Sequence, residues 1–329
     1  MLLTNKINNI FKIKSDAEFN DLALDTFHHQ YKYNLLYKNF VDLNYSDINA
    51  IKTYNEIHFI PIGFFKTHKI VTGDMHVENY FKSSGTTGQE RSTHYVKDLK
   101  LYENSFTNGF KHFFGDINKY TILALLPNYI TQQDSSLIYM VTKLIELSND
   151  SNSGFYLDNY AELNRKLKEN KNKNKKILLI GVTYALLDLA EQYPIAIPKA
   201  IIMETGGMKG RRKELVREEL HDTLTKAFGV ENIYAEYGMT ELLSQGYSKG
   251  KGLYETPPWM KILIRDVDDP LTMAGNNKSG GINVIDLANI YSCSFIATQD
   301  LGKKYDNNMF EVLGRFDNSD IRGCNLMVI

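Results

Sequence analysis

The sequence is poor in cysteine, tryptophan and long apolar runs, and these shortages exclude several classes of protein. Its 329 residues include two cysteines, Cys293 and Cys324, so the chain is no disulfide scaffold and a reducing cytoplasm is the expected location. No window approaches the ~20 uncharged apolar residues that cross a bilayer. Residues 1–14 lack the continuous apolar core and cleavage site of a signal peptide, so membrane insertion is not expected.

The chain also lacks a strong net charge. Its 38 basic and 39 acidic residues leave a net charge of −1, which gives no global field that would attract nucleic acid or a membrane surface. The hydrophobic share of 43% is ordinary for a globular protein, and the length suits one large domain or two modest ones. Nucleic acid is therefore not expected as a partner.

Hydrophobic periodicity in the first half predicts alternating helices and strands. Apolar residues at helical spacing predict a helix over residues 15–44, with Ser15 and Glu18 as a capping box. Residues 56–71 look β-rich, although Pro61 and Gly63 interrupt them. Further strands are expected at residues 80–82 and 120–126, and further helices at 97–114 and 135–147.

The second half continues this alternation and then changes. The Lys- and Asn-rich residues 165–176 have no apolar periodicity and are expected to form a solvated connection. Strands are expected at 177–181, 200–204 and 233–236, and helices at 184–192 and 215–228. Short β segments at 259–266, 281–287, 293–298 and 309–313 then predict a small antiparallel β unit attached to an α/β fold.

One loop combines hydroxyls, glycines and a cation, with the sequence Ser83-Ser84-Gly85-Thr86-Thr87-Gly88-Gln89-Glu90-Arg91. Glycines let successive N–H groups point into one concavity, the hydroxyls add donors, and Arg91 adds a fixed positive fork. The loop therefore suits a polyphosphate. It is not a Walker A loop, because a Gly-Lys-Ser/Thr ending is missing. A polar surface hairpin is the alternative interpretation.

Three more polar loops follow predicted strands. Residues 237–241 offer an aromatic face, a hydroxyl and a carboxylate, residues 298–302 include Asp300, and residues 314–317 include Arg315. Ligands of open α/β sheets gather at the carboxyl ends of strands, where Thr205-Gly206-Gly207 also lies. A nucleoside triphosphate needs such parts: a stacking surface, a carboxylate for the ribose, donors for the phosphates and a carboxylate for Mg²⁺.

The order and identity of these motifs resemble the adenylate-forming enzymes, the superfamily of acyl-CoA ligases, luciferases and adenylation domains. Within it, the chain looks most like the LuxE-type acyl-protein synthetases, through residues 60–66, 204–212 and 319–324 as well. The resemblance implies a single large domain of helix-flanked mixed sheets over residues 1–329, with subregions 1–80, 81–250 and 251–329. It also implies that the usual C-terminal lid domain, with its catalytic lysine, is absent.

The resemblance further implies a role for each motif. Ser83, Ser84, Gly85, Thr86, Thr87 and Gly88 would hold the β- and γ-phosphates of ATP. Tyr237 would stack on adenine beside Gly206 and Gly207, in the motif that also contributes Gly238. Thr240 would touch phosphate, Glu241 would bind Mg²⁺, Asp300 would hold the ribose hydroxyls, and Arg315 would lie near ribose or phosphate. Arg91 stands where many relatives have lysine, which keeps the charge but changes its geometry.

Cys324 lies near the end of the sequence, and the resemblance implies that it accepts the acyl group as a thioester. A thiolate is a strong nucleophile toward an acyl-adenylate, and Arg322 would lower the pKa of this thiol. The alternative is an inert small residue. Cys293 alternates within a predicted strand and is expected in the core.

These implications combine into one expected function. The chain would use ATP and Mg²⁺ to activate a carboxylic acid, fatty or aryl, and transfer the acyl group to Cys324 for delivery to an acyl reductase, an acyl carrier protein or CoA. An acyl- or aryl-CoA ligase similar to phenylacetate-CoA ligases is one alternative, and a non-catalytic adenylate-binding subunit is another. An oligomer is compatible with all three.

Overall fold

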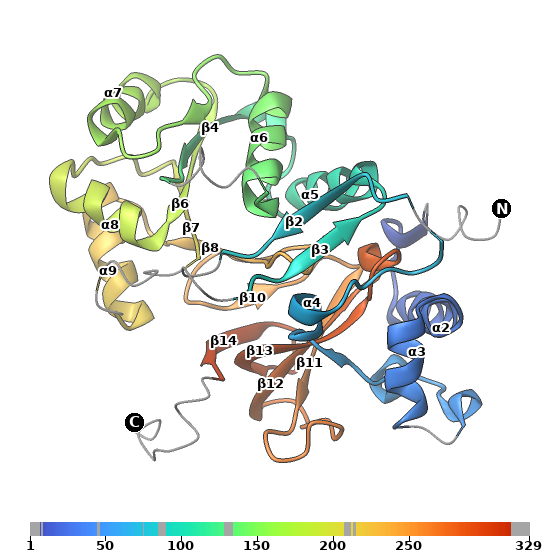
Figure 1. The fold of residues 1–329 in the computed structure, drawn as a ribbon. Helices are drawn as coiled ribbons and strands as arrows, with labels where there is room; N and C mark the ends of the chain where they lie inside the picture. The colour runs from blue at the N-terminus through green and yellow to red at the C-terminus, as the bar shows by residue number, and fades with distance from the viewer. Residues whose placement is uncertain are drawn as a thin grey trace. The chain divides into compact units, whose positions relative to one another are not determined.

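The structure of the protein is a computed structural model that describes residue 7 and residues 9–44, 47–74, 76–84, 90–127, 134–206, 212 and 215–316. The chain divides into two compact units. Figure 1 shows its helices and strands as a ribbon coloured by residue number. Unit 1 comprises residues 1–79, 92–97 and 258–329, and unit 2 comprises residues 80–91 and 98–257. The single domain expected over residues 1–329 stays a prediction, and each unit is described by itself.

Two helices of unit 1 replace the single helix predicted over residues 15–44. Helix α2 (Asp16–Tyr33) begins at Ser15, whose hydroxyl accepts a hydrogen bond from the N–H of Glu18 at 3.2 Å, so the predicted N-terminus is confirmed. The chain then turns at Asn34, and α3 (Leu35–Asp42) begins. The Asn34 side chain causes the break, because its oxygen caps α3 by accepting from the N–H of Tyr37 at 3.0 Å.

A buried polar side chain joins α2 to the C-terminal part of unit 1. Gln30 is fully buried, and its amide nitrogen donates to the carbonyls of Asn289 (3.0 Å) and Ile290 (3.1 Å). Its amide oxygen accepts from the N–H of Ser294 at 2.9 Å. Asn34 adds a hydrogen bond to the carbonyl of Ser292 at 3.0 Å. These contacts satisfy backbone groups of a buried turn that would otherwise lose their hydrogen bonds.

The predicted antiparallel β unit is confirmed. Its strands are β11 (Met260–Arg265), β12 (Ser279–Asp286), β13 (Phe295–Lys304) and β14 (Phe310–Arg315), paired antiparallel in that order, with β1 (Ile60–Pro61) parallel to β13. The β-rich prediction for residues 56–71 is wrong beyond β1, because helix α4 (Phe64–Thr67) follows at once. Short 3₁₀ helices are η1 (Ile48–Ala50), η2 (Tyr54–Glu56) and η4 (Leu287–Asn289).

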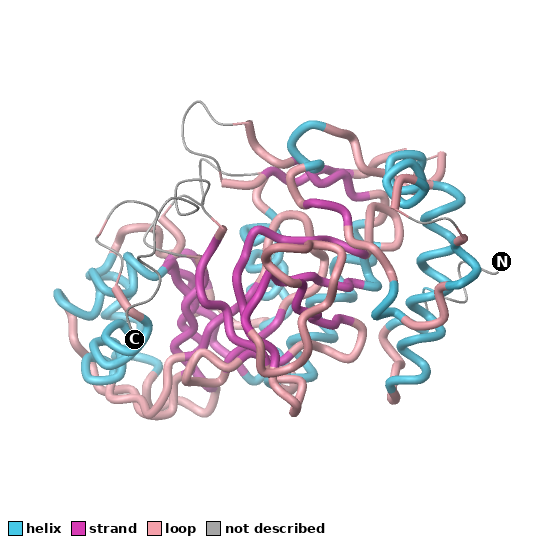
Figure 2. The backbone as a smooth tube through the Cα atoms, turned by 90° about the horizontal axis from the view of Figure 1, so that it is seen from below, coloured by secondary structure: helices cyan, strands magenta, loops and turns pink. Residues whose placement is uncertain are grey.

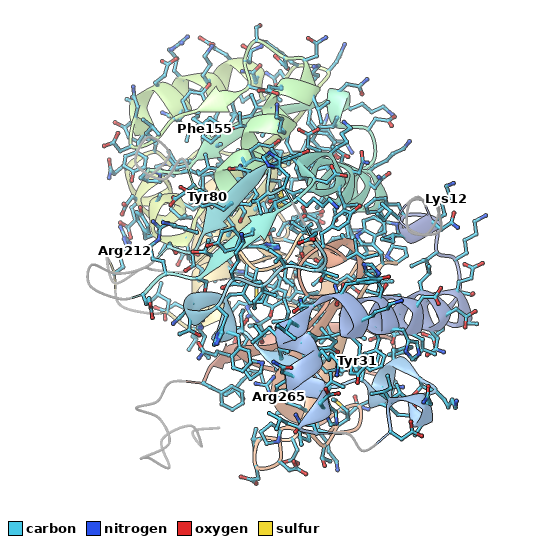
Figure 3. The ribbon with its side chains drawn as sticks, turned by 45° about the vertical axis from the view of Figure 1, so that its right-hand side comes forward. Lys12, Tyr31, Tyr80, Phe155, Arg212 and Arg265 are labelled. Carbon is cyan, nitrogen blue, oxygen red and sulfur yellow. The ribbon has the colours of Figure 1, made fainter. Side chains whose placement is uncertain are left out.

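Arg265, labelled in Figure 3, is a buried cation and the last residue of β11. Its guanidinium donates to the carbonyls of Ile282 (2.8 Å) and Thr298 (2.6 Å) and to the side chain of Asn283 (2.9 Å). Backbone acceptors thus compensate the cost of removing the charge from water. The network fixes Thr298, whose hydroxyl accepts from the N–H of Asp300 at 3.1 Å.

The sheet of unit 2 has a parallel core and an antiparallel end. Strands β5, β4, β6, β7 and β8 pair parallel in that order, and β9 and β10 continue antiparallel (Figure 2, strands in magenta). Their bounds are β4 (Tyr120–Leu125), β5 (Gly154–Phe155), β6 (Lys176–Val182), β7 (Ile201–Thr205), β8 (Tyr234–Tyr237), β9 (Gly246–Ser248) and β10 (Tyr254–Glu255). Every residue of β4 is buried, as expected for a strand covered on both faces.

Helices cover both faces of this sheet (Figure 1). They are α5 (Leu99–Phe114), α6 (Ser136–Ser148), α7 (Tyr160–Asn170), α8 (Thr183–Gln192) and α9 (Arg217–Phe228), with η3 (Ile117–Lys119) before β4. The apolar stripe predicted for residues 97–114 is buried along α5. No helix within the described ranges is long and apolar enough to cross a membrane.

The solvated connection predicted over residues 165–176 is wrong in its first half. Helix α7 extends to Asn170 and buries Leu163 and Leu167 on one face. On the other face Arg165 pairs with Glu162 at 2.6 Å. The helical periodicity cannot be seen within residues 165–176 alone, because the repeat of buried leucines begins before that stretch, at Leu163.

Two strands, β2 (Asn79–Lys82) and β3 (Thr93–Val96), flank the loop at residues 83–91.

Candidate active site

A cavity of about 170 Å³ opens in unit 2 where β7 and β8 end. Thr205, Gly206 and Glu236 line it from the strand ends, and Tyr102 of α5 and Ile138 of α6 line it from the helices. Four residues predicted to bind ATP contribute to its wall: Ser84, Gly206, Gly238 and Thr240. Three loops that are far apart in the sequence therefore meet at one place, and the parallel order of β7 and β8 predicts this for the two loops that follow them.

The base of the hydroxyl loop is held by an ion pair. The guanidinium of Arg91 lies 3.1 Å from each carboxylate oxygen of Asp134. It also donates to the carbonyl of Lys82 at 3.3 Å and to the carbonyl of Ser83. Arg91 thus ties the two ends of the loop together, a contact that suits the planar fork of arginine better than lysine. Gly85, Thr86, Thr87 and Gly88 lie outside the described residues.

A hydrogen bond from Thr183 supports the glycine turn after β7. Gly206 has a φ of 74°, a conformation that favours glycine. The hydroxyl of Thr183 donates to the carbonyl of Gly206 at 3.0 Å and to a carboxylate oxygen of Glu204 at 3.1 Å. The other oxygen of Glu204 lies 3.0 Å from Nε2 of His221. Gly207 lies outside the described residues.

The loop after β8 carries Tyr237, Gly238, Thr240 and Glu241. Tyr237 is buried, and its ring lies edge-on to Tyr254 with centroids 6.1 Å apart. Glu241 is 5% exposed, while Gly238 and Thr240 are partly exposed and line the cavity. The predicted roles of Tyr237 in adenine stacking and Thr240 in phosphate contact stay predictions.

Glu241 was the residue predicted to bind Mg²⁺. Within the described ranges, no group of three or more His, Cys, Asp or Glu side chains could hold a metal ion. The single carboxylate of Glu241 nonetheless suits Mg²⁺, because that ion is usually bound through one or two carboxylates, substrate phosphates and water. A magnesium site at Glu241 stays a prediction.

Sequence reasoning missed Glu236, which also lines the cavity. One oxygen of its carboxyl accepts a hydrogen bond from the hydroxyl of Thr205 at 2.6 Å. Burial raises the pKa of Glu236 to about 7 from its ordinary value of 4.5, and the Thr205 hydrogen bond opposes this rise. Gly238 leaves room for the carboxyl, since a Cβ at Gly238 would lie 2.2 Å from its other oxygen.

Asp300 and Arg315, predicted to contact the ribose, both belong to unit 1. They face each other across β13 and β14, and the guanidinium Nε of Arg315 lies 3.5 Å from the Asp300 carboxylate. The Arg315 side chain is 72% exposed. Asp300 and Arg315 therefore lie next to each other. That they contact the ribose stays a prediction.

Of the two cysteines, the structure describes Cys293 and not Cys324. Cys293 is fully buried, its thiol donates to the carbonyl of Phe295 at 3.5 Å, and burial raises its pKa to about 12. The prediction that it is a core residue is confirmed. Cys324 lies outside the described residues, as does Arg322.

The fold is that of the adenylate-forming enzymes. It is similar to a 2-hydroxyisobutyryl-CoA ligase in complex with 2-HIB-AMP and CoA, with a TM-score of 0.64 and 12% identity over 93% of this chain and 70% of that one. It is also similar to ATP-bound MatB from Rhodopseudomonas palustris, with a TM-score of 0.55 and 16% identity over 73% of this chain and 48% of MatB. The match thus spans about half the length of MatB.

The sequence assigns a family within this fold. The model of the LuxE acyl-protein synthetases matches residues 11–329, and the chain belongs to that family. No curated protein shows significant sequence similarity to it. The resemblance inferred from the motifs is therefore confirmed at the level of the family.

Proposed function

We propose that this protein activates a carboxylic acid with ATP. The acid's carboxylate oxygen attacks the α-phosphorus, a C–O–P linkage forms, and the bond to the β-phosphate breaks, so that acyl-AMP and pyrophosphate result. The observation that carries the proposal is the cavity shared by Ser84, Gly206, Gly238 and Thr240, in a chain of the LuxE family. Such a site works by alignment and by neutralising charge.

Each predicted residue has a part in this proposal. The hydroxyls and N–H groups of residues 83–88 bind the β- and γ-phosphates, and Thr240 contacts phosphate. Tyr237 and the glycines at 206 and 207 contact adenine. Asp300 and Arg315 hold the ribose, and Glu241 binds the Mg²⁺ that neutralises phosphate charge.

Arg91 is proposed to hold the ends of the loop in place. Its ion pair with Asp134 and its bonds to Lys82 and Ser83 join the two ends of residues 83–91. Ends that are already joined are proposed to reduce the ordering cost of ATP binding.

The second step is proposed to form a thioester on Cys324. The thiolate attacks the carbonyl carbon of acyl-AMP, the C–S bond forms, and AMP leaves with the anhydride oxygen. The thiol proton passes to solvent when the thiolate forms. The description of the family as acyl-protein synthetases supports this step over direct transfer to CoA. The acyl group then passes to a reductase, a carrier thiol or CoA.

A pyrophosphate exchange assay over a panel of fatty and aryl acids tests the first step. At least one acid should drive incorporation of labelled pyrophosphate into ATP, and a chain that binds ATP without exchange for any acid would be a non-catalytic subunit. The Asp300→Ala variant should lose exchange, because it removes the proposed ribose contact.

The second step is tested with labelled acid and two cysteine variants. Cys324→Ser should keep exchange and hold no hydroxylamine-labile acyl group, whereas the matched control Cys293→Ala should still be labelled. Undiminished labelling of Cys324→Ser rules out the proposed thioester. Rapid AMP release that requires CoA, in both wild type and Cys324→Ser, would favour the CoA ligase instead.

A further inference from the structure

A series of hydrogen bonds links helix α9 to the glycine turn after β7. Nε2 of His221, in α9, lies 3.0 Å from one carboxylate oxygen of Glu204, in β7. The other carboxylate oxygen accepts from the hydroxyl of Thr183, the first residue of α8, at 3.1 Å. The same hydroxyl donates to the carbonyl of Gly206 at 3.0 Å, and all four residues belong to unit 2.

The three side chains of this network are largely removed from water. Glu204 is 9% exposed and Thr183 is 3% exposed, and the side chain of His221 is 13% exposed. Burial of a carboxylate is costly unless each oxygen has a hydrogen-bond donor. His221 and Thr183 supply one donor to each oxygen, because a carboxylate only accepts. The carboxylate also lies beside the first turn of α8, where the helix dipole stabilises negative charge.

The hydroxyl of Thr183 has one proton to share between two acceptors. The share that goes to the carboxylate of Glu204 is lost to the carbonyl of Gly206. Donation from His221 reduces the negative charge that Glu204 presents to Thr183, because neighbouring hydrogen bonds in a network polarise one another. His221 therefore strengthens the bond between Thr183 and Gly206 without contacting either group of that bond.

The bond to Gly206 holds a turn that lines the cavity. Gly206 has a φ of 74°, and the preceding Thr205 is held by its hydrogen bond to Glu236 at 2.6 Å. The bond from Thr183 adds a second point of attachment, at the carbonyl of Gly206 itself. A turn that is held before ATP arrives loses less conformational freedom when ATP binds.

We propose that Thr183, Glu204 and His221 are positioning residues that set the affinity for ATP by holding the carbonyl of Gly206. None of the three is assigned a contact with ATP, so their loss should raise the KM for ATP and change kcat little. This inference rests on the proposed ATP site, and it adds to that site the residues that preorganise its glycine turn.

Two substitutions of Thr183 test the bond to Gly206. Thr183→Val keeps the shape and removes the hydroxyl, so the KM for ATP in pyrophosphate exchange should rise about five- to tenfold, the worth of one hydrogen bond. Thr183→Ser keeps the hydroxyl and should stay within about twofold of wild type. In the control Thr223→Val, a partly exposed hydroxyl of α9 that donates to the carbonyl of Glu219 at 2.9 Å is lost, and the KM should not change. Equal KM values for Thr183→Val and Thr183→Ser overturn the inference.

A double-mutant cycle tests whether His221 acts through Glu204. His221→Leu removes a donor and should raise the KM for ATP about three- to fivefold, whereas His221→Gln keeps a donor and should restore most of the affinity. In Glu204→Gln the amide nitrogen donates to the oxygen of Thr183, which leaves the Thr183 proton to Gly206 with or without His221. In that background His221→Leu should change the KM by less than about twofold. An equal rise in both backgrounds overturns the role of His221.

Direct binding separates this inference from the proposed function. Calorimetric titration of ATP into wild type, Thr183→Val and Thr183→Ser gives the Kd without catalysis. If no acid drives exchange, the proposed activity fails, and the ratio of Kd values between the two variants still decides the role of the network. If exchange occurs and neither KM nor Kd differs between these variants, the activity stands and the inference falls. A wild type that binds no ATP overturns both.

Discussion

Replacing Glu236 with glutamine should make the stability of the protein less sensitive to pH. The pKa of Glu236 is about 7 in the folded protein and has an ordinary value of 4.5. A carboxyl whose pKa rises on folding contributes stability that is complete below pH 4.5 and lost as the pH rises through 7. A tenfold change in proton affinity is worth about 1.4 kcal/mol, so a rise of the pKa from 4.5 to about 7 makes the loss about 3 to 4 kcal/mol at alkaline pH.

Urea denaturation at pH 4.5, 6, 7 and 8.5 measures this effect through the free energy of unfolding. Glu236→Gln should be more stable than wild type by about 3 to 4 kcal/mol at pH 8.5 and nearly equal to it at pH 4.5. Glu231→Gln, an exposed change, should follow wild type at every pH. A difference between Glu236→Gln and wild type that does not vary with pH would show that Glu236 does not titrate in this range.

Three further predictions concern other contacts. Asp134→Ala frees Arg91 and should raise the KM for ATP in exchange about tenfold with a smaller change in kcat; an unchanged KM would contradict the role of the ion pair. Cys293 should resist iodoacetamide at pH 8 in the folded protein and react fully in urea, as mass spectrometry of the modified peptide would show, because its buried thiol has a pKa of about 12. Gln30→Ala should lower the free energy of unfolding by about 2 to 4 kcal/mol, because it leaves buried backbone groups without partners; a loss below about 1 kcal/mol would count against that network.

Regular elements were largely predictable because their sequence signals are local. The stripe of α5 and the capping hydroxyl of Ser15 predict their helices through spacing alone. The break at Asn34 was not predictable in the same way, because its amide holds both Tyr37, nearby, and Ser292, far away in the sequence. The contact with Ser292 is tertiary, so hydrophobic periodicity cannot predict the turn at Asn34.

The candidate site was predictable to the extent that its residues belong to motifs. Ser84, Gly206, Gly238 and Thr240 were predicted from three loops and line one cavity. Asp134 escaped because its partner Arg91 lies 43 positions away and no spacing rule links them. Glu236 escaped because a glutamate beside a tyrosine is unremarkable in sequence. The side of the sheet that Glu236 faces follows from the alternation of side chains along β8. Its carboxyl has room there because Gly238 has no side chain.

The division of unit 1 into separate stretches of sequence has a consequence for its synthesis. Its N-terminal helix α2 is held through Gln30 by residues 289–294, and β1 pairs with β13, so both must wait for the C-terminal stretch. At ribosomal rates of 5–20 residues per second, that wait is roughly 10 to 50 s. Unit 2 is nearly continuous over residues 98–257 and can complete its sheet first. The nascent chain therefore carries the buried face of α2, with Phe19 and Phe27, without its partner, which makes residues 16–42 a natural target for chaperones during translation.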